Sequence, residues 1–207
     1  KGADISGVKA TLKSEITTAG NVKDAVTASN PYITSLKSTM NSAIATAQNV
    51  YDTSSSAAEV GSAVTTLQSA ESAFNTGMSP YNTFVTYIGT VTTGRDAETR
   101  TAPFFTTIKA TLTSSIDLSI AAKDTISVAS GITAAQSALQ TAYTQFTTDK
   151  PAYDNLNTQI TSTTSRLTTV NTRKGDTRFL MFPTATVQIL TDANTTAQAS
   201  RDNATTA

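Results

Sequence analysis

The segments PYITSLKSTM (residues 31–40) and PFFTTIKATL (residues 103–112) align without a gap at a shift of 72 residues. The match continues to residue 88 of the first copy. Identical residues in the two copies include Pro31 and Pro103, Lys37 and Lys109, Ile44 and Ile116, Leu67 and Leu139, Phe74 and Phe146, and Tyr81 and Tyr153. A self-match of this length predicts a tandem array of one structural unit with a period of about 72 residues.

Apolar residues recur at spacings of three and four within each period, which is the signature of helices. Three such stripes cover residues 5–26, 33–50 and 60–74 of the first copy. Thr and Val favour strands, but alternation is not sustained, and hairpin dipeptides such as Asn-Gly are missing. We therefore expect an all-α fold, built from tandem three-helix bundles in an elongated array.

Local signals place the helix boundaries. Ser56-Ala57-Ala58-Glu59 predicts a capping box at the start of the third stripe. Four prolines precede periodic stretches, where each is expected in a first helical turn: Pro31, Pro80, Pro103 and Pro151. In the third copy Pro183 falls inside the second stripe, where it would cost about 3 kcal/mol and shorten or break the helix.

The period and these signals divide the chain into three parts. We expect a first repeat at residues 1–79, a second at 80–151, and a partial, diverged third at 152–207 that ends in a polar C-terminal tail. Terminal repeats of an array are often atypical because they cap it.

The composition excludes several classes of protein. Charged residues make up 14% of the chain, and fifteen basic residues balance fifteen acidic ones, so no basic patch predicts binding to a nucleic acid. The chain has no Cys and no His, the main ligands of zinc, haem and iron–sulfur centres and the commonest catalytic groups. We expect no enzymatic activity, no cofactor and no metal. No apolar run approaches the ~20 residues of a membrane span.

The stretch SAAEVGSAVTTLQSA (residues 56–70) resembles the last helix of the FIVAR-type three-helix repeats of large bacterial cell-surface proteins. Leu36, Ala43, Ile44 and Ala47 fit the preceding helix of that pattern, whereas Ser130-Gly131-Ile132 departs from it in the second copy. The resemblance implies rod-like stalks that project other domains, with occasional contact to a polymer or glycan. It implies no catalytic residues.

Aromatic residues are the first candidate site. Tyr81, Phe104, Phe105 and Tyr153 lie at the starts of predicted helices, where they should meet at one end of a bundle. They could form a contact patch for a glycan or an apolar ligand. The alternative, which helical aromatic stripes favour, is a core layer that closes the end of the bundle.

Three further patterns carry weaker signals. The closest acidic pairs, Asp96 with Glu98 and Asp149 with Asp154, are interpreted as solvated surface charge. Threonines spaced by eleven, as in Thr147, Thr158 and Thr169, could form an ice-binding face, but Thr is so abundant that chance explains them. Asn194 and Asn203 match the N-glycosylation pattern and are expected to be accessible in the polar tail.

These observations favour a non-enzymatic, extracellular or cell-surface structural protein, such as a stalk, spacer, adhesin segment, or protomer of a fibre or surface layer. Its expected partners are itself or neighbouring repeats, and a glycan or surface polymer. The alternative is a secreted helical bundle that binds an apolar small molecule or lipid between its helices.

Overall fold

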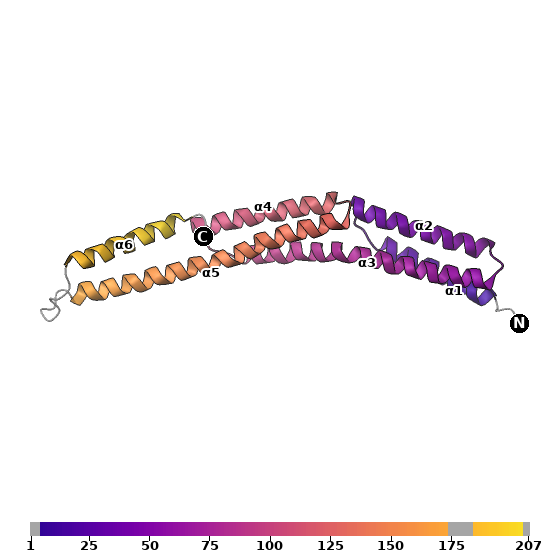
Figure 1. Cartoon of the computed structure of the whole chain (residues 1–207), viewed down its shortest axis with the longest axis horizontal. Helices are drawn as coiled ribbons and strands as arrows, with labels where there is room; N and C mark the ends of the chain where they lie inside the picture. Colours follow the sequence, from indigo (N-terminus) through magenta and orange to yellow (C-terminus); the bar gives the residue numbers. More distant parts are fainter. Residues whose placement is uncertain (1–4, 174–183, 205–207) are drawn as a thin grey trace. The chain divides into compact units, whose positions relative to one another are not determined.

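The computed structural model describes residues 5–173 and 184–204, and within them the only regular elements are six α-helices (Figure 1). In chain order they are α1 (Ile5–Asp24), α2 (Pro31–Thr53), α3 (Ala57–Asp96), α4 (Pro103–Thr125), α5 (Ala129–Arg173) and α6 (Thr184–Asn203). The all-α prediction is confirmed. Pro183, and with it the predicted break in the third copy, lies outside the described residues.

The chain divides into two compact units, each described by itself. Unit 1 comprises Lys1–Gly89 and Leu118–Ser137, and unit 2 comprises Thr90–Asp117 and Ala138–Ala207. The predicted boundaries at 79/80 and 151/152 fall inside α3 and α5. The division into three repeats stays a prediction.

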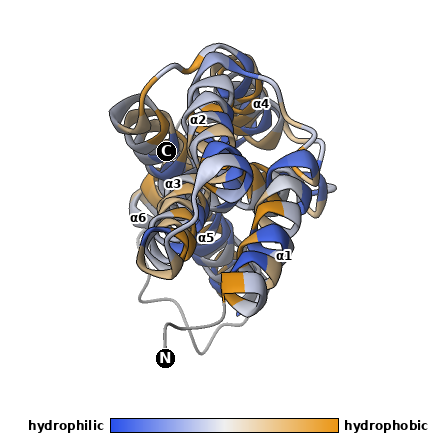
Figure 2. Cartoon of the chain, turned by 90° about the vertical axis from the view of Figure 1, so that its right-hand side faces the viewer, coloured by the Kyte–Doolittle hydropathy of each residue, from blue (hydrophilic) through white to orange (hydrophobic). Residues whose placement is uncertain are grey.

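Buried residues form a narrow stripe on every helix, with one position recurring every seven residues. The stripes include Leu12 and Ala19 on α1, Ile33, Met40 and Ala47 on α2, Val60, Leu67 and Phe74 on α3, Leu112 and Ser119 on α4, Ile132, Leu139 and Phe146 on α5, and Val187 and Asn194 on α6. A spacing of seven is typical of bundle and coiled-coil seams. Figure 2 shows both hydrophobic and hydrophilic residues on the helices.

In unit 1, α1, α2 and the first part of α3 pack into a helical bundle. Lys23 on α1 donates a 2.7 Å hydrogen bond to Asn41 on α2. The Tyr32 hydroxyl on α2 donates to the backbone oxygen of Gly77 on α3 at 2.8 Å. A Cβ atom at Gly77 would lie 2.8 Å from the Leu36 side chain, so the absence of a side chain permits this close approach of α2 to α3.

Two of the four prolines do not lie where the sequence predicts. Pro31 and Pro103 begin α2 and α4 as expected, but Pro80 and Pro151 lie inside α3 and α5. An internal proline removes a backbone hydrogen bond. Buried residues on both sides of Pro80, among them Met78 and Phe84, anchor the two halves of α3. We attribute the continuity of the helix to this packing, which outweighs the local cost.

The start of α2 is tied to the end of α4 within unit 1. The Asn30 Oδ1 atom accepts a 2.8 Å hydrogen bond from the Ile33 backbone N–H and so caps α2. The Asn30 Nδ2 atom donates to the Lys123 backbone oxygen at 2.8 Å. The Tyr32 N–H donates to the Ile126 backbone oxygen at 3.0 Å, which satisfies another first-turn donor.

The predicted capping box at α3 is formed in part. The Ser56 hydroxyl accepts a 3.3 Å hydrogen bond from the Glu59 N–H, as the box requires. The Glu59 carboxylate does not reach back to the Ser56 backbone but accepts a 2.7 Å bond from the Ser54 hydroxyl. The Ser54 hydroxyl oxygen in turn accepts a hydrogen bond from the Ser56 N–H at 3.0 Å. Ser54 therefore links the Ser56 N–H to the Glu59 carboxylate, which would bond directly in a complete capping box.

Replacing Asn30 by Ala should lower the free energy of unfolding by about 2 kcal/mol, because the helix loses its cap and the Lys123 carbonyl loses a donor. Urea unfolding followed by circular dichroism measures the change. The matched control is Asn49→Ala, an exposed asparagine on α2, which should change stability by less than about 0.5 kcal/mol. Equal effects of the two substitutions would contradict the capping role.

Candidate functional site

Three of the four predicted aromatic residues meet in unit 2. The ring centroids of Phe104 and Phe105 lie 5.1 Å apart, and Tyr153 lies 4.8 Å from each of them. Both phenylalanines are buried, and Tyr153 is half-buried. Tyr81 belongs to unit 1, where it is buried and lines a pocket together with Phe74 and Met78. The placement supports the core-layer interpretation for the two phenylalanines, and a contact role for the tyrosines stays a prediction.

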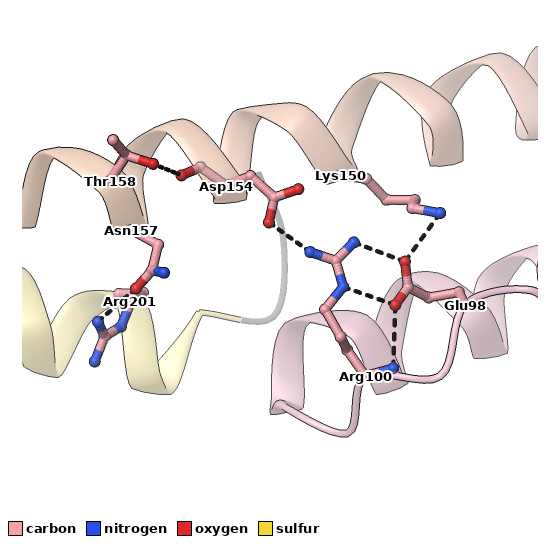
Figure 3. Close-up of polar contacts among 7 residues, drawn as sticks. All are labelled: Glu98, Arg100, Lys150, Asp154, Asn157, Thr158 and Arg201. Atoms are coloured by element: carbon pink, nitrogen blue, oxygen red, sulfur yellow. Dashed lines mark hydrogen bonds and ion pairs between the residues drawn. The ribbon is translucent and has the colours of Figure 1, made fainter. Parts of the chain in front are cut away.

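An ionic cluster adjoins these rings, centred on the buried carboxylate of Glu98 (Figure 3). The Glu98 side chain is only 4% exposed and follows the end of α3. Arg100 donates to it from Nε at 2.7 Å, from a terminal guanidinium nitrogen at 2.7 Å and from its own backbone N–H at 3.1 Å. Lys150 on α5 lies 2.9 Å from the same carboxylate. Both carboxylate oxygens are therefore occupied by cationic donors.

Arg100 lies between two carboxylates and an aromatic ring. Its other terminal nitrogen donates to Asp154 at 2.5 Å, and Figure 3 shows the guanidinium between Glu98 and Asp154. The guanidinium carbon lies 3.6 Å from the centroid of the Phe105 ring, a cation–π contact. Lys109 on α4 donates to the Glu98 backbone oxygen at 2.6 Å. The short connection between α3 and α4 is thereby fastened to α5 and to α4.

The cluster shifts the ionisation of Glu98. Hydrogen bonds from Arg100, assisted by Lys150, lower the pKa of the carboxyl from 4.5 to about 2, although desolvation opposes the shift. Hydrogen bonding to Glu98 also raises the pKa of Arg100. A carboxylate that is ionised and fully paired is suited to holding segments together. It is poorly suited to general acid or base catalysis, which needs a pKa near the working pH.

The interpretation of the acidic pairs as solvated surface charge is wrong for two of the four residues. Glu98 and Asp149 are both buried, whereas Asp96 and Asp154 are exposed. Asp149 accepts a hydrogen bond from Gln145, one turn earlier on α5. Burial of the two carboxylates is possible because each has a donor. Arg100 and Lys150 belong to no sequence motif. The alignment at 72 residues, however, places the uncharged Ala28 and Met78 opposite them. The presence of charged residues in one segment alone was a usable signal of this cluster.

The asparagines of both sequons, Asn194 and Asn203, lie in α6, where the sequence predicts a polar tail. Asn194 is 8% exposed, and its Nδ2 atom, to which a glycan would be attached, donates to the Thr164 hydroxyl at 2.9 Å. Asn203 is exposed, and its Nδ2 atom donates to the Ala199 backbone oxygen at 2.8 Å. The expected accessibility therefore holds only for Asn203. Its glycosylation stays a prediction.

The threonines spaced by eleven turn their hydroxyls back to the helix. Thr147, Thr158 and Thr169 each donate to the backbone oxygen four residues earlier, at 2.9–3.0 Å. A hydroxyl used in this way has its hydrogen committed to its own helix. The arrangement gives no support to an ice-binding face.

A groove runs between α2 and α3 in unit 1. It has a volume of about 610 Å³ and is lined mainly by small side chains. The lining includes Ala43, Ala47, Val50, Ala63 and Leu67, with Ser and Thr hydroxyls between them. Glu59 is the charged residue of the lining, so the surface that the groove offers to a ligand is mostly apolar.

Residues 5–173 and 184–204 contain no group of three or more Asp, Glu, Cys or His side chains placed to hold a metal. Among the same residues, no helix has both the length and the apolar character needed to cross a bilayer. Comparison with protein-family models, curated proteins and solved structures finds no match. The resemblance to FIVAR-type repeats stays a prediction.

Replacing Glu98 by Gln should destabilise the protein by about 2 to 3 kcal/mol at pH 7, because Arg100 and Lys150 lose their shared counter-charge. The folded-state pKa of Glu98 is depressed, so its contribution is fully present above pH 4.5 and disappears as the pH falls from 4.5 towards 2. The difference in urea unfolding free energy between the wild type and E98Q should therefore shrink over this range.

The matched control is Asp117→Asn, an exposed carboxylate on α4 in the same unit. This substitution should change stability by less than about 0.5 kcal/mol at every pH. A difference between the wild type and E98Q that stays constant from pH 7 to pH 2.5 would contradict the assignment of the ionic cluster.

Proposed function

We propose that this chain is a non-enzymatic structural repeat protein of the extracellular space or cell surface, acting as a stalk, spacer, adhesin segment or fibre protomer. The observation that carries the proposal is the recurrence of helix boundaries at the period of the sequence. Pro31 and Pro103 begin two helices of 23 residues each, α2 and α4, and stand 72 positions apart. Ala57 and Ala129, which begin α3 and α5, differ by the same number.

Tertiary contacts support the same period. Lys37 donates to the backbone oxygen of Val26, and Lys109 donates to that of Glu98. Each member of the second pair stands 72 positions after its counterpart in the first. If the chain is an array of one unit, its copies should share helix boundaries and tertiary contacts. The two segments share both the helix starts and this bond from a lysine side chain to a backbone oxygen. Arrays of this kind provide length, spacing and surface.

The third copy supports association with another chain or repeat. Leu12, Phe84 and Leu156 occupy the same position at successive shifts of 72 residues. The first two are fully buried, but Leu156 is 42% exposed. On α6, Ile189 and Leu190 are also exposed. These apolar side chains would be covered if a neighbouring helix completed the third bundle.

The chemistry of unit 2 favours a structural role. Its buried carboxylates are paired with donors, and its closest aromatic residues are packed against one another. An extracellular or cell-surface location, and contact with a glycan or surface polymer, rest on the composition and on the resemblance to FIVAR-type repeats. They are part of the proposal.

Small-angle X-ray scattering over a concentration series tests the proposal. We expect an elongated particle, either of fixed length, as for a stalk, or growing with concentration, as for a fibre protomer. Growth should be weakened by Leu190→Lys, which places a charge on the exposed face of α6. Leu118→Lys, at an exposed leucine of α4, is the matched control and should leave growth unchanged. A compact globule at every concentration would contradict both forms of the proposal.

The groove between α2 and α3 favours a second candidate function, binding of an apolar small molecule or lipid. Its volume lies within the ~300–1,000 Å³ usual for ligand sites. On this hypothesis the native protein should co-purify with an apolar compound detectable by mass spectrometry. Ala63→Phe, which fills the groove, should abolish retention, whereas Ala121→Phe at an exposed site of α4 should not. A ligand-free protein, or equal retention by both variants, would contradict this candidate.

A further inference from the structure

Helix α6 carries two apolar stripes. The first includes the buried Val187, on the side where Asn194 is bonded to Thr164 of α5. The second is formed by Ile189, Leu190, Ala193 and Ala197, at the spacing of three and four residues that marks one helix face. Ile189 and Leu190 are 68% and 47% exposed, so the described residues leave this second stripe largely uncovered. It is uncharged and about 12 Å long.

The groove between α2 and α3 in unit 1 has a matching length and lining. It spans residues 42–50 of α2 and 58–67 of α3, each about 12 to 14 Å of helix. Its lining offers accessible apolar surface, since Ala43, Val50 and Ala63 are half-buried and Ala58 is exposed. Small side chains allow a helix to approach closely. A groove of this kind is suited to the apolar face of another helix.

The segments that carry these two surfaces have opposite charge. From residue 38 to residue 94 the chain has three acidic residues, Asp52, Glu59 and Glu71, and no basic one. Glu59 belongs to the lining of the groove and is exposed. From residue 155 to residue 191 the chain has four basic residues and one acidic one. Two of these basic residues, Arg166 and Arg173, are exposed on α5.

This charge pattern selects the partner of α6. Pairing α6 with α6 of another copy would bring two basic segments together, and like charges at an interface are unfavourable. Pairing α6 with the α2–α3 groove of another copy brings a basic segment to an acidic one. The same contact covers the apolar stripe of α6 and fills the groove.

We propose that α6 of one chain binds in the α2–α3 groove of a second copy, so that the chains associate head to tail. Such a contact leaves one unused α6 and one unused groove, and it therefore repeats into a filament or closes into a ring. The proposal deepens the fibre-protomer form of the proposed function and rests on it. Because the contact is shorter than a standard interface, we expect a Kd of about 10 to 100 µM.

Light scattering from the full chain at about 10 µM to 1 mM, a range that includes the expected Kd, tests the proposal. The mean mass of the wild type should rise above the 21.5 kDa of one chain. Leu190→Lys on the stripe and Thr46→Lys at an exposed position of the groove lining should each raise the Kd at least about tenfold. Each substitution places a charge in an apolar contact.

An equimolar mixture of these two variants is the decisive measurement. L190K retains the groove and T46K retains the α6 stripe, so the mixture should form a complex of two chains and nothing larger. Thr39→Lys, at an exposed threonine of α2 outside the lining, is the matched control and should associate like the wild type. Ala63→Phe, which fills the groove without adding a charge, should behave like T46K. Circular dichroism checks that every variant is helical.

Four results would overturn the proposal: no association at about 1 mM, at least ten times the expected Kd, association that L190K abolishes but T46K and A63F do not, a mixture whose two variants do not combine, or equal loss with Thr39→Lys. A monomeric chain that retains an apolar compound would assign the groove to the second candidate function instead. The scattering series separates this failure from that of the proposed function, because an elongated particle of fixed length removes only the head-to-tail contact.

Discussion

Burial of one apolar position in every seven residues is the constraint on which the rest of this structure depends. The helices are rich in Thr and Ser, which form helices poorly on their own, so tertiary packing must hold them. On α3 the series Val60, Leu67, Phe74, Tyr81 and Ile88 is buried throughout. Burial of each large apolar side chain contributes about 1.5 to 3 kcal/mol. An internal proline costs a helix about 3 kcal/mol, which is similar to the contribution of one such side chain. The five buried side chains together therefore outweigh the cost of Pro80, and the helix continues through it.

Threonine hydroxyls reconcile a polar composition with long helices. Along α5, Thr158, Thr161 and Thr164 each donate to the backbone oxygen four residues earlier. A side chain that turns back in this way has less need of water or of a neighbouring charge. Ion pairs at the α3–α4 connection join segments that are distant in sequence, as in Arg100 with Asp154 and Lys150 with Glu98. Other pairs, such as Lys23 with Asp24 and Lys123 with Asp124, join neighbouring residues of one helix.

Periodicity predicts the helical class and most buried positions, because the spacing of apolar residues reports directly on which face is buried. The starts of α2 and α4 are predicted by Pro31 and Pro103. Periodicity does not predict the continuity of α3, since the local preference of proline is overridden by the packing of buried residues on both sides of it, such as Met78 and Phe84. The burial of Glu98 was also missed. A lone glutamate resembles any surface charge until the fold brings Arg100 and Lys150 to it. Its best sequence signal was comparative, namely charge in the second copy where the first has Val26 and Met78.

The two segments aligned at 72 residues keep their buried stripe while the residues beside it differ. The apolar stripe positions are kept, so Phe74 and Phe146 are both buried. The residues beside them differ together: Arg100, which replaces Ala28 in the alignment, is paired with both Glu98 and Asp154. Removing Glu98 would leave both Arg100 and Lys150 without their shared counter-charge. The aligned positions 26, 28, 78 and 82 carry Val, Ala, Met and Asn, so none of the four charges is present there.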